Sequence, residues 1–199
     1  MIIESTNVEN MHQSPAFAKP LLGAVRGYNE AVPMTRRYPN LPNKVLKRDS
    51  EIVRKIITAW DLENDANKVL SIYLKESKNL SDERYWELLR TVWVICGSVE
   101  NADLFRKLMQ SSRKQKYYFS TPEEAKFLRE LPEQVEIYRA TNNINDNGLS
   151  WTLSKEYAEW YKTAYQKDKV ITQFINKKQI FAYINRNLES EVVVLSYCT

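Results

Sequence analysis

Histidine, cysteine and glycine are scarce in this chain. Its 199 residues include one histidine, His12, two cysteines and four glycines. A single histidine excludes most histidine-based metal sites, and it excludes the Ser-His-Asp and Cys-His arrangements of nucleophilic catalysis. Four glycines leave no room for the glycine-rich loops with which Rossmann and P-loop folds bind phosphate. Any catalytic chemistry is therefore expected to use other side chains and no metal.

Long apolar runs and a secretory leader are also missing from the sequence. No stretch of apolar residues approaches the length needed to span a bilayer. Residues 1–4 lack the basic start and apolar core of a signal peptide, so we expect an intracellular, cytoplasmic protein. Cys96 lies in a strongly apolar helical segment and Cys198 is next to the last residue. We therefore expect no structural disulfide.

The composition is that of a globular protein. Hydrophobic residues make up 43% of the chain and charged residues 27%, which argues against disorder. A chain of this length can form one or two domains and bury a large core. The net charge of +4 permits a nucleic-acid partner without requiring one.

Residues 1–48 are predicted to form a proline-rich N-terminal arm. Five of the seven prolines lie there, and no hydrophobic period is sustained, so neither a long helix nor a central strand is expected. Two interpretations stay open: a solvated linker, or a segment that contacts a partner or the body of the protein. The basic residues that could contact phosphate or a partner are Arg26, Arg36, Arg37, Lys44, Lys47 and Arg48.

Residues 49–116 are predicted to form a helical region, with helices near 49–60, 63–77, 81–97 and 101–109. In the first of these, Ile52, Ile56 and Trp60 recur at helical spacing. The region ends in a basic run that comprises Arg106, Lys107, Arg113, Lys114 and Lys116. Such a run indicates either a solvated helix end or, with the aromatic residues 117–119, a surface that binds single-stranded nucleic acid.

Residues 117–199 are predicted to be rich in strands. A helix should begin at Thr121, with Pro122 in its first turn and Glu124 completing a capping box, and should stop before Pro132. Strands are expected near 135–141, 148–152, 170–175, 180–184 and 190–196. A helix near 154–165 should lie between the second and third strands. We expect its inner side to carry Tyr157, Trp160, Tyr161, Ala164 and Tyr165.

Three of these strands carry candidate site residues. Arg139 lies in the first strand. In the second, Ser150 and Thr152 should share one face, with Trp151 on the other, because side chains alternate along a strand. Glu189 and Glu191 should likewise share a face of the last strand. Two carboxylates side by side repel each other, so this pair indicates either a functional site or a solvated strand start.

The order of these residues resembles a known family. Arg139, then Ser150-Trp151-Thr152 leading into a helix, then Glu189-Ser190-Glu191 before three valines resembles the ADP-ribosyltransferase superfamily of the Arg-Ser-Glu type. That group includes bacterial toxins and phage-encoded mono-ADP-ribosyltransferases. The resemblance covers roughly residues 117–197, and Ser-Trp-Thr departs from the commoner Ser-Thr-Ser.

The resemblance implies an α+β fold in which an N-terminal helical bundle packs on a C-terminal split β-sandwich. Residues 117–199 would form the catalytic region, alone or as one compact domain with residues 49–116. The resemblance also implies NAD as a substrate and a macromolecular acceptor, with no membrane partner.

The resemblance assigns roles to the catalytic residues. Cleavage of NAD between nicotinamide and ribose builds positive charge on the ribose, as in glycoside hydrolysis. Glu191 would stabilise that charge in the transition state. Ser150 would hold Glu191 in place by donating a hydrogen bond. Glu189 would orient or deprotonate the acceptor, which favours a protein arginine and leaves RNA or a nucleobase open.

The remaining site residues would bind NAD. Arg139 would pair with the pyrophosphate, for which its forked donors are suited. Thr152 would support the strand edge or the nicotinamide pocket, and Trp151 is assigned to the same binding region.

The sequence thus predicts an NAD-dependent mono-ADP-ribosyltransferase, in the context of a phage, toxin or defence effector. Three alternatives stay open. One is an NAD glycohydrolase, in which water replaces the acceptor. Another is a non-catalytic interaction module that keeps the fold. The third is a helical nucleic-acid-binding protein with an incidental sheet.

Overall fold

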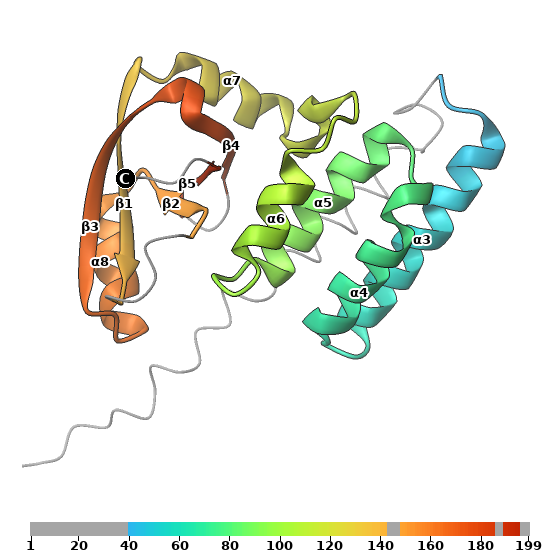
Figure 1. Ribbon diagram of the computed structural model, residues 1–199, viewed down its shortest axis with the longest axis horizontal. Coiled ribbons are helices and arrows are strands. Elements are labelled where there is room, and N and C mark those ends of the chain that lie inside the picture. The colour runs from blue at the N-terminus through green and yellow to red at the C-terminus, as the bar shows by residue number, and fades with distance from the viewer. Residues whose placement is uncertain (1–39, 143–147, 186–188, 196–199) are drawn as a thin grey trace, which may run out of the picture. The chain divides into compact units, whose positions relative to one another are not determined.

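The computed structural model describes residues 40–142, 148–185 and 189–195 (Figure 1). The chain divides into two units, Met1–Leu41 and Pro42–Thr199. Every helix and strand of the described residues lies in the second unit. Most of the predicted arm, including His12, falls outside the described residues, as does Cys198.

Six α-helices and five strands make up the described part of the chain, so the predicted α+β class is confirmed. The helices are α3 (Asn43–Asp61), α4 (Ala66–Glu76), α5 (Asp82–Cys96), α6 (Ala102–Met109), α7 (Pro122–Glu130) and α8 (Lys155–Ala164). The strands are β1 (Gln134–Thr141), β2 (Ser150–Thr152), β3 (Lys169–Asn176), β4 (Ile180–Ile184) and β5 (Glu191–Val194). Short 3₁₀ turns are η1 (Ser77–Asn79), η2 (Lys116–Phe119) and η3 (Lys177–Gln179).

Helix α3 begins six residues before the predicted start at Asp49, so residues 43–48 of the predicted arm are helical. Pro42 directly precedes the first turn, where its missing N–H costs nothing, and its carbonyl accepts from the N–H of Val45 (2.9 Å). The inward positions of α3 include Leu46 and Asp49, both buried. A charged residue at an inward position interrupts the apolar spacing. The spacing therefore did not predict that residues 43–48 belong to the helix.

Capping residues set the beginnings of α5 and α7, and those of α7 are the ones predicted. The Ser81 hydroxyl accepts from the N–H of Arg84 (3.3 Å). In α7, Thr121 and Glu124 form the predicted capping box: the Glu124 N–H donates to Thr121 Oγ1 (3.2 Å) and the Thr121 N–H donates to Glu124 Oε2 (2.8 Å). These bonds satisfy N–H groups that a helix leaves unpaired at its first turn.

The five strands form one antiparallel sheet with the order β3-β1-β2-β5-β4. Strands β1 and β3 pair over eight residues, from Gln134 with Asn176 to Thr141 with Lys169. By contrast, β1 and β2 are joined by a single residue pair, Tyr138 with Thr152. The sheet is therefore divided into a β3–β1 part and a β2–β5–β4 part, which meet at this pair.

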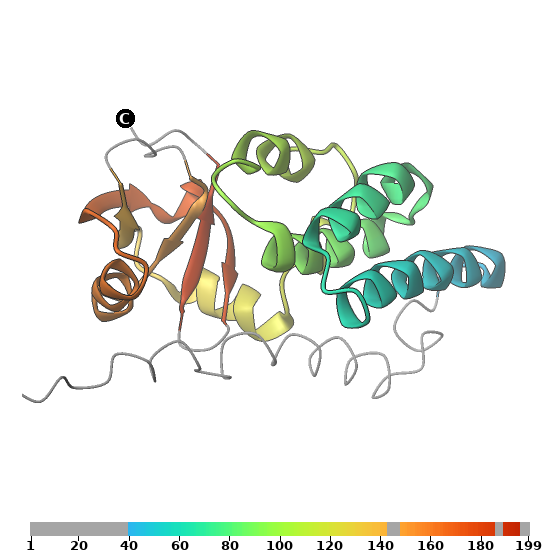
Figure 2. The same ribbon diagram turned by 90° about the horizontal axis from the view of Figure 1, so that it is seen from below.

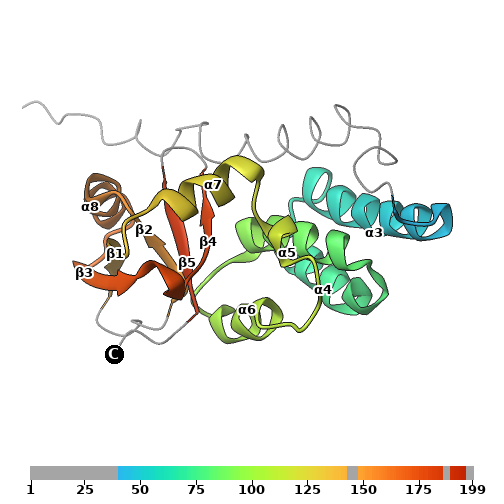
Figure 3. The same cartoon turned by 90° about the horizontal axis from the view of Figure 1, so that it is seen from above.

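Both faces of the β2–β5–β4 part are covered. One face packs on the core of α3 to α6 through Leu149, Ala182, Ile184 and Val193. The other face forms a second cluster with Leu128 of α7 and with Leu131; its strand residues are Val135, Ile137, Trp151, Ile175, Ile180, Tyr183, Val192 and Val194. Figures 2 and 3 show α7 and α8 near the sheet. They show the helices α3 to α6 on the opposite side of the sheet from α8. Burial on both faces explains why the valines of β5 show no alternation of burial.

The basic run that starts in α6 is only partly a solvated helix end, because Lys107, Lys114 and Lys116 are exposed. Arg106 is buried, and its Nε donates to the Leu195 carbonyl beyond β5 (3.0 Å). Lys116 lies over the Phe181 ring, 4.1 Å from the ring centroid, and burial lowers the pKa of its ammonium group. Phe119 is fully buried. Arg106 and Phe119 are thus used inside the fold, whereas Tyr117 is 65% exposed, so the stacking surface stays a prediction.

The aromatic residues of α8 differ from the prediction as well. Ala158 is the buried residue of this helix, whereas Trp160 is 40% and Tyr165 53% exposed. The rings pack on one another along the helix, and those of Tyr161 and Tyr165 stack with centroids 4.3 Å apart. The predicted inner side was therefore wrong for Trp160, Ala164 and Tyr165, which are exposed, whereas Tyr157 and Tyr161 are half-buried. None of the helices in the described ranges is long and apolar enough to cross a membrane.

Candidate functional site

Glu191 occupies the first position of β5 and is only 4% exposed. It pairs with Thr152 of β2 on one side and with Ile184 of β4 on the other. Its Oε1 accepts two hydrogen bonds, one from the Ser150 hydroxyl (2.7 Å) and one from the indole N–H of Trp93 in α5 (3.1 Å). The predicted hydrogen bond from Ser150 to Glu191 is therefore present.

The register of β2 against β5 explains this contact. Thr152 lies opposite Glu191, and Ser150 lies opposite Val193. Residues opposite each other in an antiparallel pair share a face, and so do residues two apart on one strand. Ser150 is consequently the diagonal neighbour of Glu191 on the helix-facing side. Ser150 is an exposed residue, whereas the carboxylate that it contacts is buried.

Glu189 does not lie on the strand with Glu191, so the predicted shared strand face was wrong. Strand β5 begins at Glu191, and Ser190 adopts a left-handed conformation with φ of 44°. A residue with positive φ turns the chain, so the alternation of an extended segment does not pass through it.

The end of β2 holds this turn in place. The Thr152 hydroxyl donates to the Glu189 carbonyl (2.5 Å), and the Leu153 N–H donates to the Ser190 carbonyl (3.1 Å). Thr152 is buried, and its hydroxyl also accepts from the Ser154 N–H (3.0 Å). Its observed contacts therefore support the strand edge, one of the two roles predicted for it.

Arg139 lies on the opposite face of the sheet from Glu191. Tyr138 pairs with Thr152 and shares its face, so the next residue of β1 points the other way. The Arg139 guanidinium donates from Nη1 to the Gly148 carbonyl (2.8 Å) and lies 5.8 Å from the centroid of the Trp151 ring. The structure thus brings Ser150 and Glu191 into contact and places Arg139 beside the residues that lead into β2.

Trp151 is on the opposite strand face from Ser150 and Thr152, as predicted. It is buried in the second apolar cluster. Its observed contacts are packing contacts and the face it presents to Arg139. The assignment of Trp151 to NAD binding stays a prediction.

Trp93 is the site residue that the sequence reasoning missed. The sequence predicted a helix near residues 81–97 and assigned no site role to Trp93. The signal that could have found it is the indole N–H, because a buried tryptophan needs a hydrogen-bond acceptor. Which acceptor it meets could not be read from the chain, since 98 residues separate Trp93 from Glu191.

The site is a buried carboxylate whose orientation is set by two neutral donors on one oxygen. A carboxylate held in this way is preorganised, so it can stabilise a developing positive charge without first reorienting. The candidate cation, Arg139, lies at the divide between the two parts of the sheet.

Comparison of the chain with protein-family models, curated proteins and solved structures found no match.

Proposed function

We propose that this protein is an NAD-dependent mono-ADP-ribosyltransferase that transfers ADP-ribose to a macromolecular acceptor. The observation that carries the proposal is the 2.7 Å hydrogen bond from the Ser150 hydroxyl to Glu191 Oε1, which joins β2 to β5. It is the contact that the Arg-Ser-Glu pattern implies between its second and third members. A chance match of sequence letters gives no reason for these two side chains to meet.

Glu191 would act on the ribose of NAD. As the bond to nicotinamide breaks, the ribose becomes oxocarbenium-like and positively charged. A fixed carboxylate attracts this charge more strongly in the transition state than in the neutral ground state, and that difference accelerates the reaction. Ser150 would keep the carboxylate in the required rotamer.

The divided sheet supports the same proposal. A split β-sandwich needs two sets of strands that separate, and the single Tyr138–Thr152 pair marks such a division. Arg139 lies at this division with one nitrogen donating to the Gly148 carbonyl. Arg139 would bind the pyrophosphate of NAD, because the planar fork of a guanidinium suits two phosphate oxygens.

Glu189 would act on the acceptor. Its carbonyl is held by Thr152, so the position of its backbone is defined relative to Glu191. We favour a protein arginine as the acceptor, with RNA or a nucleobase as the other macromolecule to test. The cellular context would be that of a phage, toxin or defence effector.

Glu191→Gln tests the reaction itself. The amide keeps the shape and an acceptor oxygen but removes the negative charge. Release of nicotinamide from NAD by the purified protein should fall at least about 100-fold, while the melting temperature changes little. Glu51→Gln, on the exposed side of α3, is the matched control and should keep full activity. Equal activity in both variants would remove the assigned role.

A second measurement identifies the acceptor. The protein is incubated with labelled NAD in a cell lysate, and the products are digested with protease or with nuclease. Label lost on protease treatment indicates a protein acceptor, and label lost on nuclease treatment indicates a nucleic acid. Nicotinamide release without any labelled macromolecule would indicate hydrolysis in place of transfer.

A further inference from the structure

Helix α5 contacts the first residue of β5 directly and is linked to the residue after β4 through Glu124 of α7. Trp93 and Arg90 are three residues apart on α5, so they lie on the same side of the helix. Trp93 donates to Glu191, the first residue of β5. Arg90 reaches the other end of the β4–β5 connection, next to β4, through Glu124.

The Trp93 indole is held rigidly. It is buried, and its ring packs edge-on against Phe105 of α6 with centroids 5.0 Å apart. Gly97 follows α5 so closely that an added Cβ would lie 2.5 Å from the Trp93 carbonyl and 3.1 Å from its ring. The indole N–H is thus aimed at Glu191 Oε1 by packing from two helices and the turn between them.

Glu124 fixes the start of the connection. Its Oε1 accepts from Arg90 Nη2 (2.6 Å) and from the backbone N–H of Asn185 (2.9 Å), the residue directly after β4. Its Oε2 accepts from the Thr121 N–H within the capping box. The Glu124 side chain is 5% exposed, so this charge-assisted bond between Arg90 and Glu124 is shielded from water.

We propose that α5 is a positioning element for the reaction, in which Trp93 orients the Glu191 carboxylate and the Arg90–Glu124 pair holds Asn185, the residue after β4. This inference rests on the proposed function. Ser150 and Trp93 approach the same oxygen from β2 and from α5, so together they define the plane of the carboxylate. The helical region would thereby contribute directly to the site that the strands carry.

Trp93→Phe tests the positioning role, because it keeps an aromatic ring and removes only the N–H donor and the outer ring. For nicotinamide release we expect kcat to fall by about 10- to 100-fold, the range for losing one hydrogen bond to a charged group. KM for NAD should stay within about twofold, because an orienting contact acts on the reacting step.

Trp86→Phe is the matched control. Trp86 lies on the same helix, is fully buried, and donates its indole N–H to the Lys114 carbonyl (2.6 Å) away from Glu191. It should lose stability to a similar degree and keep kcat. A kcat that is unchanged in Trp93→Phe, or lowered equally in both variants, would overturn the proposal.

A second readout does not depend on catalysis. In ¹⁵N-tryptophan-labelled protein, Glu191→Gln should move the Trp93 indole N–H resonance and leave that of Trp86 in place. An unmoved Trp93 resonance would overturn the positioning role. If the wild-type protein releases no nicotinamide, the proposed function fails, and this spectrum still decides whether Trp93 is bonded to Glu191.

Discussion

At the scale of single residues, Gly148 and Arg139 depend on each other. A Cβ added to Gly148 would overlap the guanidinium of Arg139, so no larger residue fits there while Arg139 keeps its place. The Gly148 carbonyl accepts from the same guanidinium (2.8 Å). The absence of a side chain at residue 148 therefore determines where the candidate pyrophosphate-binding cation lies.

Gly148→Ala should displace the Arg139 guanidinium and weaken NAD binding. The flexible Arg139 side chain can move away from the new methyl group, so the free energy of unfolding should fall by no more than about 1–2 kcal/mol. KM for NAD should rise about tenfold, as expected for weakening one charged contact with the substrate. Steady-state kinetics and urea denaturation of the same preparation measure both effects.

Alanine at an exposed position next to the same strands provides the control. Thr172→Ala in β3 changes an exposed residue and should leave KM unchanged. If Gly148→Ala binds NAD as well as the wild type, Arg139 has no role that depends on this position.

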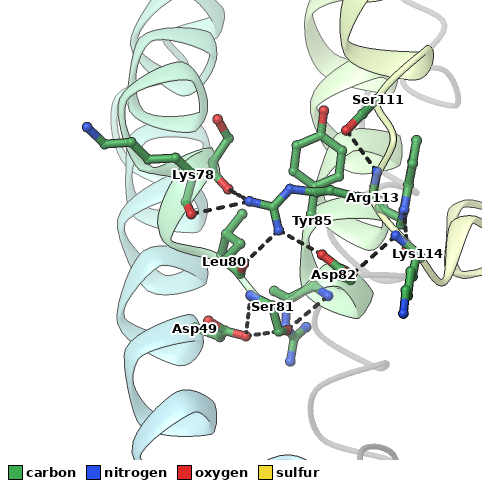
Figure 4. Close-up of polar contacts among 12 residues, drawn as sticks. Asp49, Lys78, Leu80, Ser81, Asp82, Tyr85, Ser111, Arg113 and Lys114 are labelled. Carbon is green, nitrogen blue, oxygen red and sulfur yellow. Dashed lines mark hydrogen bonds and ion pairs between the residues drawn. The ribbon is translucent and has the colours of Figure 1, made fainter.

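At the scale of elements, Arg113 joins the end of α4 to the start of α5 (Figure 4). Its guanidinium donates to the carbonyls of Leu80 (2.9 Å), Ser77 (3.0 Å) and Lys78 (3.2 Å), and pairs with Asp82 Oδ1 (3.0 Å). It also lies 4.7 Å from the centroid of the Tyr85 ring. One side chain thus donates to three carbonyls at the η1 turn, of which that of Ser77 also accepts from the Leu80 N–H (3.3 Å).

Asp49 completes this junction from α3. The carboxylate is buried, and its Oδ2 accepts from the Ser81 hydroxyl (2.6 Å) and the Ser81 N–H (3.3 Å). Ser81 is the N-cap of α5, so Asp49 connects α3 to the cap of another helix. The position of α5, and with it that of Trp93, therefore depends on polar contacts made by α3 and by the segment after α6.

Arg113→Met should destabilise the protein by about 2–3 kcal/mol, because it removes the guanidinium that three carbonyls share and the ion pair with Asp82. Urea denaturation measures the loss. Arg54→Met, at an exposed position of α3, should change the free energy of unfolding by less than about 0.5 kcal/mol. A loss in Arg113→Met no larger than that of the control would show that the junction contributes nothing to stability.

At the scale of the whole molecule, the helical and strand regions share one hydrophobic core within the Pro42–Thr199 unit. Leu149, Ala182, Ile184 and Val193 of the strand region belong to the same cluster as the buried residues of α3 to α6. The predicted boundary between residues 116 and 117 therefore cuts through a core. The sequence left open whether residues 117–199 form a domain alone or together with residues 49–116. This packing favours one compact domain that includes both.

Residues 117–199 alone should fail to fold. Without the helices, one apolar face of the sheet and the carboxylate of Glu191 would be exposed to water. The free energy of unfolding of a small domain is low, so the loss of this buried surface should prevent folding. We expect a circular dichroism signal without a cooperative thermal transition. Residues 42–199 should unfold in a single transition, as expected for one cooperative unit. A sharp transition in the 117–199 fragment would contradict the shared core.

Local patterns in the sequence were enough to predict most elements. The capping box predicted the start of α7, and the helix predicted near 81–97 and the strand predicted near 135–141 agree with α5 and β1. These features act through neighbouring residues, so they can be read along the chain. Prediction failed where a polar side chain makes a contact with a distant part of the chain. Asp49 is buried against Ser81, so the apolar spacing did not show where α3 begins. Arg106 donates to the Leu195 carbonyl after β5, which a basic run in the sequence does not indicate.

The candidate site divides in the same way. The identity and order of Arg139, Ser150 and Glu191 are properties of the sequence, and so is the strand alternation that turns Trp151 away from Ser150. Only the tertiary structure decided that Ser190 turns the chain between the two glutamates, that Arg139 lies on the other sheet face, and that Trp93 reaches Glu191. These three features follow from strand register and from packing between distant helices. Register and packing depend on contacts between residues far apart in the sequence, so the spacing of residues along the chain does not predict them.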